Sequence, residues 1–116
     1  MSLIFRDPYS ARGTVARWLS ALSGRKASGV YVIREKGIIW TPILYVGESH
    51  TGALYKTILR HFQNWTGKTA GATYPRTKVE VAVIRTADKT ALERQNKLIA
   101  ELDPRDNIEG KPESPF

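Results

Sequence analysis

Two β-branched and aromatic segments in the first half of the chain constrain its fold more than any other feature. Residues 29–35 read Gly-Val-Tyr-Val-Ile-Arg-Glu, and residues 42–47 read Pro-Ile-Leu-Tyr-Val-Gly. Val, Ile and Tyr favour extended backbone because their side chains pack well on a pleated surface. The connection between the segments is short and contains Gly37. Together they predict a β-hairpin.

A third strand is predicted over residues 78–86. Three valines fall on one face of this segment, and an alanine and an isoleucine fall on the other. They are Val79, Val81 and Val83, and Ala82 and Ile84. Apolar side chains on both faces are typical of a strand that is covered on both sides.

Three segments have helical periodicity. Residues 10–22 predict a short amphipathic helix, and a second helix is predicted from a cap at Ser49 or Thr51 to about Trp65. A long helix capped by Thr86 or Asp88 is predicted to run to Leu102, and Pro104 ends it. In the second helix we expect an apolar side and, opposite to it, a polar side. The apolar side holds Leu54, Ile58, Phe62 and Trp65, and the polar side holds Lys56, Thr57, Arg60 and His61.

These elements predict an α/β fold of the α+β type: a small, mainly antiparallel sheet of three strands with helices on its faces. A chain of 116 residues fits a single domain over 1–116. We expect a core of about 28–107, an N-terminal helical extension of 1–27 and a polar tail of 108–116.

The charge distribution indicates a polyanionic partner. The chain has 18 Lys and Arg against 11 Asp and Glu, for a formal net charge of +7. Two stretches without acids, between Asp7 and Glu35 and between Glu48 and Glu80, hold ten of the cations. These are Arg12, Arg17, Arg25, Lys26 and Arg34, then Lys56, Arg60, Lys68, Arg76 and Lys78. A solvated basic surface and a nucleic-acid-binding face both account for this pattern.

Other features exclude several classes of protein. The chain has no cysteine, which excludes a disulfide framework and a cysteine nucleophile, and its two histidines make a structural zinc site improbable. Its apolar stretches are too short for a membrane span, and residues 1–9 lack the apolar region of a secretory signal. We therefore expect a soluble, cytoplasmic protein with no membrane partner.

Several motifs stand in a characteristic order. Gly29-Val30-Tyr31 and Leu44-Tyr45-Val46-Gly47 lie on the two hairpin strands, and a basic helix follows them. Ala91-Leu92-Glu93, Leu98-Ile99, Leu102, Pro104 and Asn107 come later. From about residue 28 to 107 this set resembles the GIY-YIG nuclease family, whose name records the two tripeptides. Each tripeptide alone is weak evidence, but the ordered set is fairly specific.

The resemblance implies a DNA endonuclease that hydrolyses a phosphodiester with a divalent ion, Mg²⁺ or Mn²⁺. It implies that Tyr31 is the base or a relay towards water, with Tyr45 beside it and Asn107 in support. It implies that Glu93 holds the metal. A helical wheel places Glu93 away from the stripe of Leu92, Leu98, Ile99 and Leu102, which by itself indicates only an exposed carboxylate.

Alternation along the strands places Tyr31 with Ile33 and Tyr45 with Ile43, so two phenols can share one face. Ordinary strand aromatics would show the same pattern. Since a phenol has a reference pKa near 10, base catalysis by Tyr31 requires nearby cations that depress its pKa. Gly47 marks a place where backbone or ligand can approach closely.

The chain departs from the family at one position. Many members have an arginine on the second helix with a histidine four residues later; here His61 matches the histidine, but Thr57 stands at the arginine position. Either Arg60, helped by Lys56 and His61, binds the scissile phosphate, or the cation is lost. Lys56, Arg60, Lys68, Arg76, Lys78 and Gly47 are the expected DNA contacts. A catalytically silent nucleic-acid-binding module is the alternative, and a separate or fused DNA-recognition partner is compatible with either.

Overall fold

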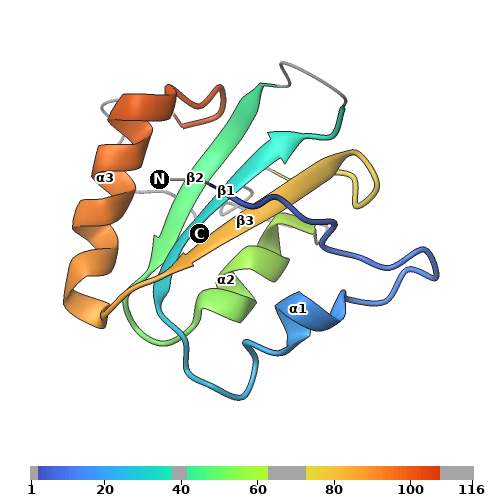
Figure 1. Cartoon of the computed structure of the whole chain (residues 1–116), viewed down its shortest axis with the longest axis horizontal. Helices are drawn as coiled ribbons and strands as arrows, with labels where there is room; N and C mark the ends of the chain where they lie inside the picture. Colours follow the sequence, from blue (N-terminus) through green and yellow to red (C-terminus); the bar gives the residue numbers. More distant parts are fainter. Residues whose placement is uncertain (1–2, 38–41, 63–72, 108–116) are drawn as a thin grey trace, which may run out of the picture.

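The computed structural model describes residues 3–37, 42–62 and 73–107, and these form a three-stranded antiparallel sheet with helices on both faces (Figure 1). The strands are β1 (Gly29–Glu35), β2 (Ile43–Ser49) and β3 (Val79–Arg85), in the order β2-β1-β3. The fold class predicted from the sequence is confirmed. Both outer strands pair with β1 over its length, which makes β1 the centre of the molecule.

Short helices cover one face of the sheet and one long helix covers the other (Figure 1). Helices α1 (Arg17–Ser20) and α2 (Leu54–Leu59) share a core with one set of strand residues, and a 3₁₀ turn, η1 (Arg60–Phe62), continues α2. Helix α3 (Ala91–Leu102) follows a second 3₁₀ turn, η3 (Asp88–Thr90), and packs on the opposite face.

Alternation along β1 separates the two cores. Tyr31 and Ile33 are buried with the α1 and α2 side chains, whereas Val30 and Val32 are buried with Leu98 of α3. In β3 the valines lie on one face and the alanine and isoleucine on the other, as the sequence predicted; the valines face α2, and the alanine and isoleucine face α3. A strand with apolar residues on both sides is stable only when both faces are covered, and the two helical layers meet that need.

The predicted helix over residues 10–22 is wrong for most of its length. Only the four residues of α1 are helical. Before them the chain turns: Gly13 has a φ of +84°, and the hydroxyls of Ser10 and Thr14 are hydrogen-bonded at 2.7 Å. Glycine disfavours a helix interior because it adopts positive φ easily, and serine because its hydroxyl bonds to nearby groups outside a helix. Here this local preference prevails over the apolar spacing.

Two further side chains lie on a face that the sequence did not predict. Ile43 was expected beside Tyr45, but it packs in the α3 core, because a register shift opposite Ile33 and Arg34 interrupts the alternation of β2. Leu92 was expected in the apolar stripe of α3, but it is 50% exposed. In addition, α2 ends at Leu59, well before the predicted end at Trp65, and residues 63–65 lie outside the described part of the chain.

The N-terminal segment completes the edge of β3. The amide and carbonyl of Arg6 both bond to Val81, at 3.0 and 2.9 Å, and the Arg34 guanidinium lies 3.9 Å from the ring centre of Phe5. Among the described residues, no helix is long and apolar enough to cross a membrane.

Gly47 generates a first prediction. It pairs with Tyr31 across the strands, and a Cβ at position 47 would overlap the Tyr31 phenol. Gly47→Ala should therefore lower the free energy of unfolding by about 1–3 kcal/mol, the usual cost of overpacking a core. Urea denaturation measures this. At Gly24 an added Cβ meets nothing, so Gly24→Ala is the matched control and should be neutral or slightly stabilising. Equal stability of the two variants would contradict the argument.

Candidate active site

The phenol of Tyr31 lies at the centre of the candidate site. It is packed against the backbone of Gly47 and only 1% exposed, and its hydroxyl is 2.7 Å from Nε2 of His61. His61 itself is fully buried in η1, at the end of α2. The hydrogen bond therefore joins the first motif to the basic helix, thirty residues apart in sequence. Which of the two atoms donates depends on the tautomer of His61.

Three tyrosines surround His61. Its ring centre lies 5.4 Å from Tyr31, 4.7 Å from Tyr45 and 5.9 Å from Tyr74. The Tyr74 hydroxyl donates to Oδ2 of Asp106 at 2.7 Å. The sequence predicted that Tyr31 and Tyr45 share a face, and the structure brings them together with His61. It did not predict Tyr74, because residues 66–77 carry no strand or helix pattern.

The pKa of Tyr31 moves in the direction opposite to the one that base catalysis requires. Burial raises it well above 10, the nearby phenols of Tyr45 and Tyr74 and the charge of Glu48 raise it further, and the charge of Arg60 opposes the rise. Tyr31 is therefore a neutral phenol at physiological pH. The sequence-based expectation that cations depress its pKa is wrong, because desolvation of the buried oxygen is the larger effect.

The four residues predicted on the polar side of α2 separate into two pairs. Lys56 and Arg60 are exposed, as expected, but Thr57 and His61 are buried. The Thr57 hydroxyl donates to the carbonyl of Ala53 at 2.9 Å. Position 57 is therefore filled by an inward-facing side chain. An exposed cation exists one turn later at Arg60, close enough for its charge to act on Tyr31.

Asn107 fastens the strand that carries the second motif. Its Oδ1 accepts a hydrogen bond from the amide of Val46 at 2.8 Å, and its Nδ2 donates to the carbonyl of Val46 at 2.9 Å. Because β2 is an edge strand among the described residues, no strand there pairs with these backbone groups on that side. Asn107 thus holds β2 immediately before Gly47.

Glu93 lies apart from the rings. It is exposed in the first turn of α3, on the helix that covers the opposite face, at the sheet end where β2 and β3 terminate (Figure 1). In the described part of the chain, no hydrogen bond or ion pair joins its carboxylate to another side chain. The described residues also hold no group of three or more His, Cys, Asp or Glu side chains that could bind a metal ion alone. An open carboxylate does fit Mg²⁺, which proteins often bind through one or two carboxylates together with substrate phosphates.

The remaining cations are spread over the surface. The Arg76 guanidinium lies 4.3 Å from the ring centre of Tyr9, and Lys78 is exposed beside the start of β3. Lys68 lies outside the described residues.

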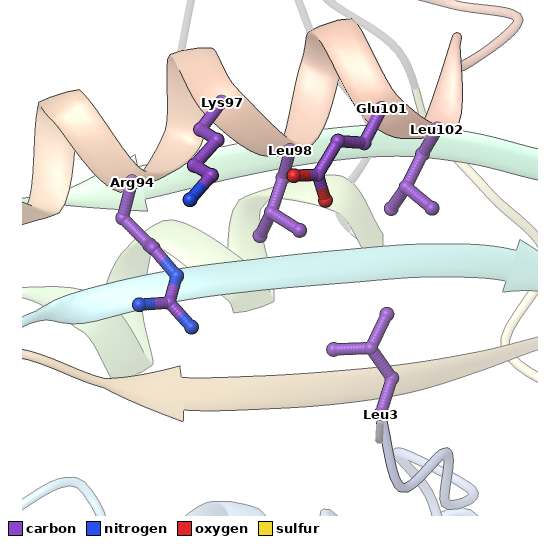
Figure 2. A pocket seen from close by; sticks show the side chains of 6 residues that line it. All are labelled: Leu3, Arg94, Lys97, Leu98, Glu101 and Leu102. Carbon is purple, nitrogen blue, oxygen red and sulfur yellow. The ribbon is translucent and has the colours of Figure 1, made fainter. Parts of the chain in front are cut away.

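A hollow lies on the α3 face of the sheet, opposite the face that holds the rings. It has a volume of about 350 Å³, and Figure 2 shows side chains of α3 directed towards Leu3 across it. Its lining consists of Leu3, Leu98 and Leu102 with Arg94, Lys97 and Glu101. It contains one carboxylate and no histidine, so it offers fewer groups for acid–base chemistry than the ring cluster.

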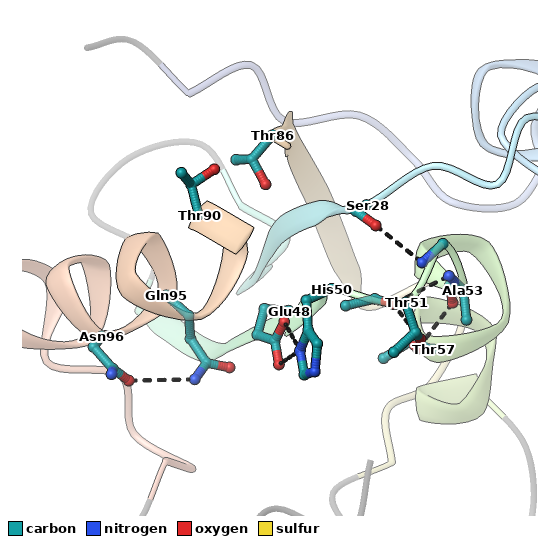
Figure 3. A network of polar contacts seen from close by, with 12 residues as sticks. Ser28, Glu48, His50, Thr51, Ala53, Thr57, Thr86, Thr90, Gln95 and Asn96 are labelled. Carbon is teal, nitrogen blue, oxygen red and sulfur yellow. Dashed lines mark hydrogen bonds and ion pairs between the residues drawn. The ribbon is translucent and has the colours of Figure 1, made fainter. Parts of the chain in front are cut away.

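A carboxylate–imidazole pair that the motifs did not indicate lies at the end of β2. Nδ1 of His50 is 3.0 Å from Oε2 of Glu48, and Figure 3 shows the two side chains facing each other between α2 and α3. The only available signal in the sequence was that Glu48 directly follows Gly47.

Comparison with known proteins adds no assignment, since no family model, curated protein or solved structure matches the chain.

The buried phenols generate a prediction for alkaline pH. Burial also raises the pKa of Tyr74, so Tyr31 and Tyr74 stay protonated in the fold at a pH where an unfolded tyrosine ionises. Their contribution to stability is complete below pH about 10 and is lost as the pH rises above it. In urea denaturation from pH 8 to 11, Tyr31→Phe should therefore lose less stability with rising pH than the wild type. Parallel slopes would contradict the raised pKa.

Proposed function

We propose that the protein hydrolyses phosphodiester bonds of DNA with a divalent cation. One observation carries the proposal: the fold brings three distant motif segments to a single phenol. Tyr31 packs on Gly47, bonds to His61, and lies within electrostatic reach of Arg60. This convergence agrees with the sequence resemblance to GIY-YIG nucleases, and the excess of cations supports a polyanionic substrate.

Arg60 is the residue proposed to bind the scissile phosphate. It is exposed, it follows α2 directly, and it is anchored next to the buried His61. A guanidinium donates two parallel hydrogen bonds to a phosphate and stays charged at every physiological pH. Exposed Lys56, one turn earlier, adds charge to the same surface.

Glu93 is the residue proposed to hold the metal. A divalent cation bound to Glu93 and the substrate phosphate would neutralise the negative charge that develops on the phosphoryl oxygens. The open carboxylate of Glu93 meets that requirement, whereas the mostly buried carboxylate of Glu48 is engaged by His50.

The buried rings have a positioning role. The neutral phenol of Tyr31 cannot accept a proton from water, and neither Tyr31 nor His61 reaches solvent. Their hydrogen bond fixes η1 to β1, and this anchors the backbone of Arg60. Tyr45 and Tyr74 pack around His61 and exclude water from the bond.

A silent nucleic-acid-binding module is the second candidate. The burial of Tyr31 and His61 favours it, because a buried pair cannot touch a substrate. It predicts DNA binding that weakens steeply with salt and no cleavage under any metal. Plasmid nicking with Mg²⁺, Mn²⁺ or EDTA separates the two functions.

The role of Arg60 predicts a selective loss of rate. Arg60→Ala should lower single-turnover cleavage of plasmid DNA by about 10²–10³, the usual effect of losing one preorganised charge-stabilising donor. Arg17→Ala removes another exposed charge, on α1, and is the matched control, with a loss of less than tenfold expected. Thr57→Arg should give no gain, since it would bury a guanidinium. Equal rates for Arg60→Ala and the control would remove Arg60 from the site.

The role of Glu93 predicts a separate loss. Glu93→Ala should abolish cleavage in Mg²⁺ while the affinity for DNA and the unfolding free energy stay close to wild type, because an exposed carboxylate contributes little to the core. Glu101→Ala, an exposed glutamate on the same helix, should cleave normally. Wild-type cleavage by Glu93→Ala would refute the assignment.

A further inference from the structure

His50 and Glu48 form an ordered pair at the end of β2. Nδ1 of His50 lies 3.2 and 3.0 Å from the two carboxylate oxygens of Glu48. The imidazole is 56% exposed, whereas the carboxylate is only 13% exposed (Figure 3). An accessible imidazole is therefore held in one orientation by a mostly buried acceptor.

This arrangement determines which ring nitrogen is available. A carboxylate accepts hydrogen bonds and donates none, so Nδ1 carries the hydrogen in the neutral ring. Nε2 then holds a lone pair on the side of the ring away from Glu48. The chain has two histidines, and the other, His61, is fully buried against Tyr31. His50 is thus the histidine that water can reach.

The loop that carries His50 is fixed by residues just before β1 and at the end of β2. The amide of Gly52 donates to Oγ of Ser28 at 2.9 Å, and the amide of Ala53 donates to Oγ of Ser49 at 3.1 Å. Leu54 continues the attachment through its amide, which donates to the carbonyl of Ala27 at 3.1 Å. A preorganised loop lowers the entropic cost of placing a catalytic group.

The pair lies at the end of the sheet where α3 begins, next to the strand position that packs against Tyr31. Glu48 directly follows Gly47, on which the Tyr31 phenol rests, and its charge acts on that phenol. The end of β2 also adjoins the end of β3 through Gly29, which pairs with both Ser49 and Arg85. The first turn of α3, with Glu93, follows at this end of the sheet (Figure 1).

We propose that His50 is the general base of the hydrolysis and that Glu48 positions it; this assignment rests on the proposed function. An oxygen lone pair of water forms the new bond to phosphorus while Nε2 of His50 takes a proton from that water. The bond from phosphorus to the leaving oxygen breaks, and its electron pair stays on that oxygen, which takes a proton from solvent. Glu48 keeps its hydrogen bond to Nδ1 throughout, and the imidazolium then returns its proton to solvent.

Chemical rescue tests the assignment. His50→Ala should slow single-turnover nicking of supercoiled plasmid by about 10²–10⁴, the usual contribution of a general base. Free imidazole should restore part of that rate in His50→Ala and leave the wild type unchanged. His50→Gln, which keeps a polar side chain of similar size, should be equally slow. The exposed neighbour gives the control Thr51→Ala, which should cleave like the wild type.

Glu48 is tested through the same readout. Glu48→Gln keeps an oxygen acceptor for Nδ1 but removes the charge, so its rate should fall between those of the wild type and His50→Ala. If Glu48 acts only through His50, the double variant His50→Ala with Glu48→Gln should be no slower than His50→Ala alone.

The outcomes separate the two proposals. A wild-type protein that leaves plasmid intact with both metals overturns the proposed function, and the role of His50 with it. If the wild type cleaves and His50→Ala is equally fast, only the role of His50 is overturned. A slow His50→Ala variant that imidazole does not accelerate also overturns the role of His50. In that case the slow rate comes from a structural defect, which a free base cannot repair.

Discussion

The phenol of Tyr31 occupies space that only a glycine at position 47 leaves open, and its hydroxyl bonds to His61. This contact joins the central strand, an edge strand and the turn after α2. A side chain at position 47 would displace the ring, and without the ring His61 would be a buried imidazole lacking that hydrogen bond. Removing one partner of a buried hydrogen bond costs about 1–3 kcal/mol. The pairing of β1 with β2 and the position of η1 therefore depend on one another.

The same burial separates the residues of the candidate site into a buried group and an exposed group. Tyr31 and His61 are too deeply buried to meet a substrate, and desolvation keeps the phenol protonated. The groups that solvent can reach, Arg60, His50 and Glu93, lie outside the strands, on η1, on the loop after β2 and on α3. A rigid interior with reactive groups at the ends of its elements is a common way to hold a site in place.

Much of the fold was predictable because its signals are local. The β-branched runs of β1 and β3 alternate without interruption, and they form strands at almost the predicted residues. Predictions failed where the local pattern was ambiguous or interrupted. Gly13 turns a chain with helical spacing, and the irregular register near Ile33 moves Ile43 to the other face. Thr57 looked like a vacancy on a polar surface, but it faces the core.

The site was predictable only for the residues that lie on periodic strands. Tyr31, Tyr45 and Gly47 lie on paired strands, and alternation allows the two tyrosines to share a face in the register that pairs Tyr31 with Gly47. Tyr74 and Asp106 join them from segments without periodicity, and His50 depends on a loop fastened by Ser28.

The sequence by itself determined the strands, the covered sheet and the order of the motifs, because hydrophobic periodicity and turn preference act over a few residues. Only the tertiary structure decided which polar groups are buried. His50 and His61 are the same residue type eleven positions apart, yet one is exposed and the other fully buried. Burial depends on what packs from elsewhere in the chain, and burial sets the protonation of Tyr31 and the access of water to each histidine.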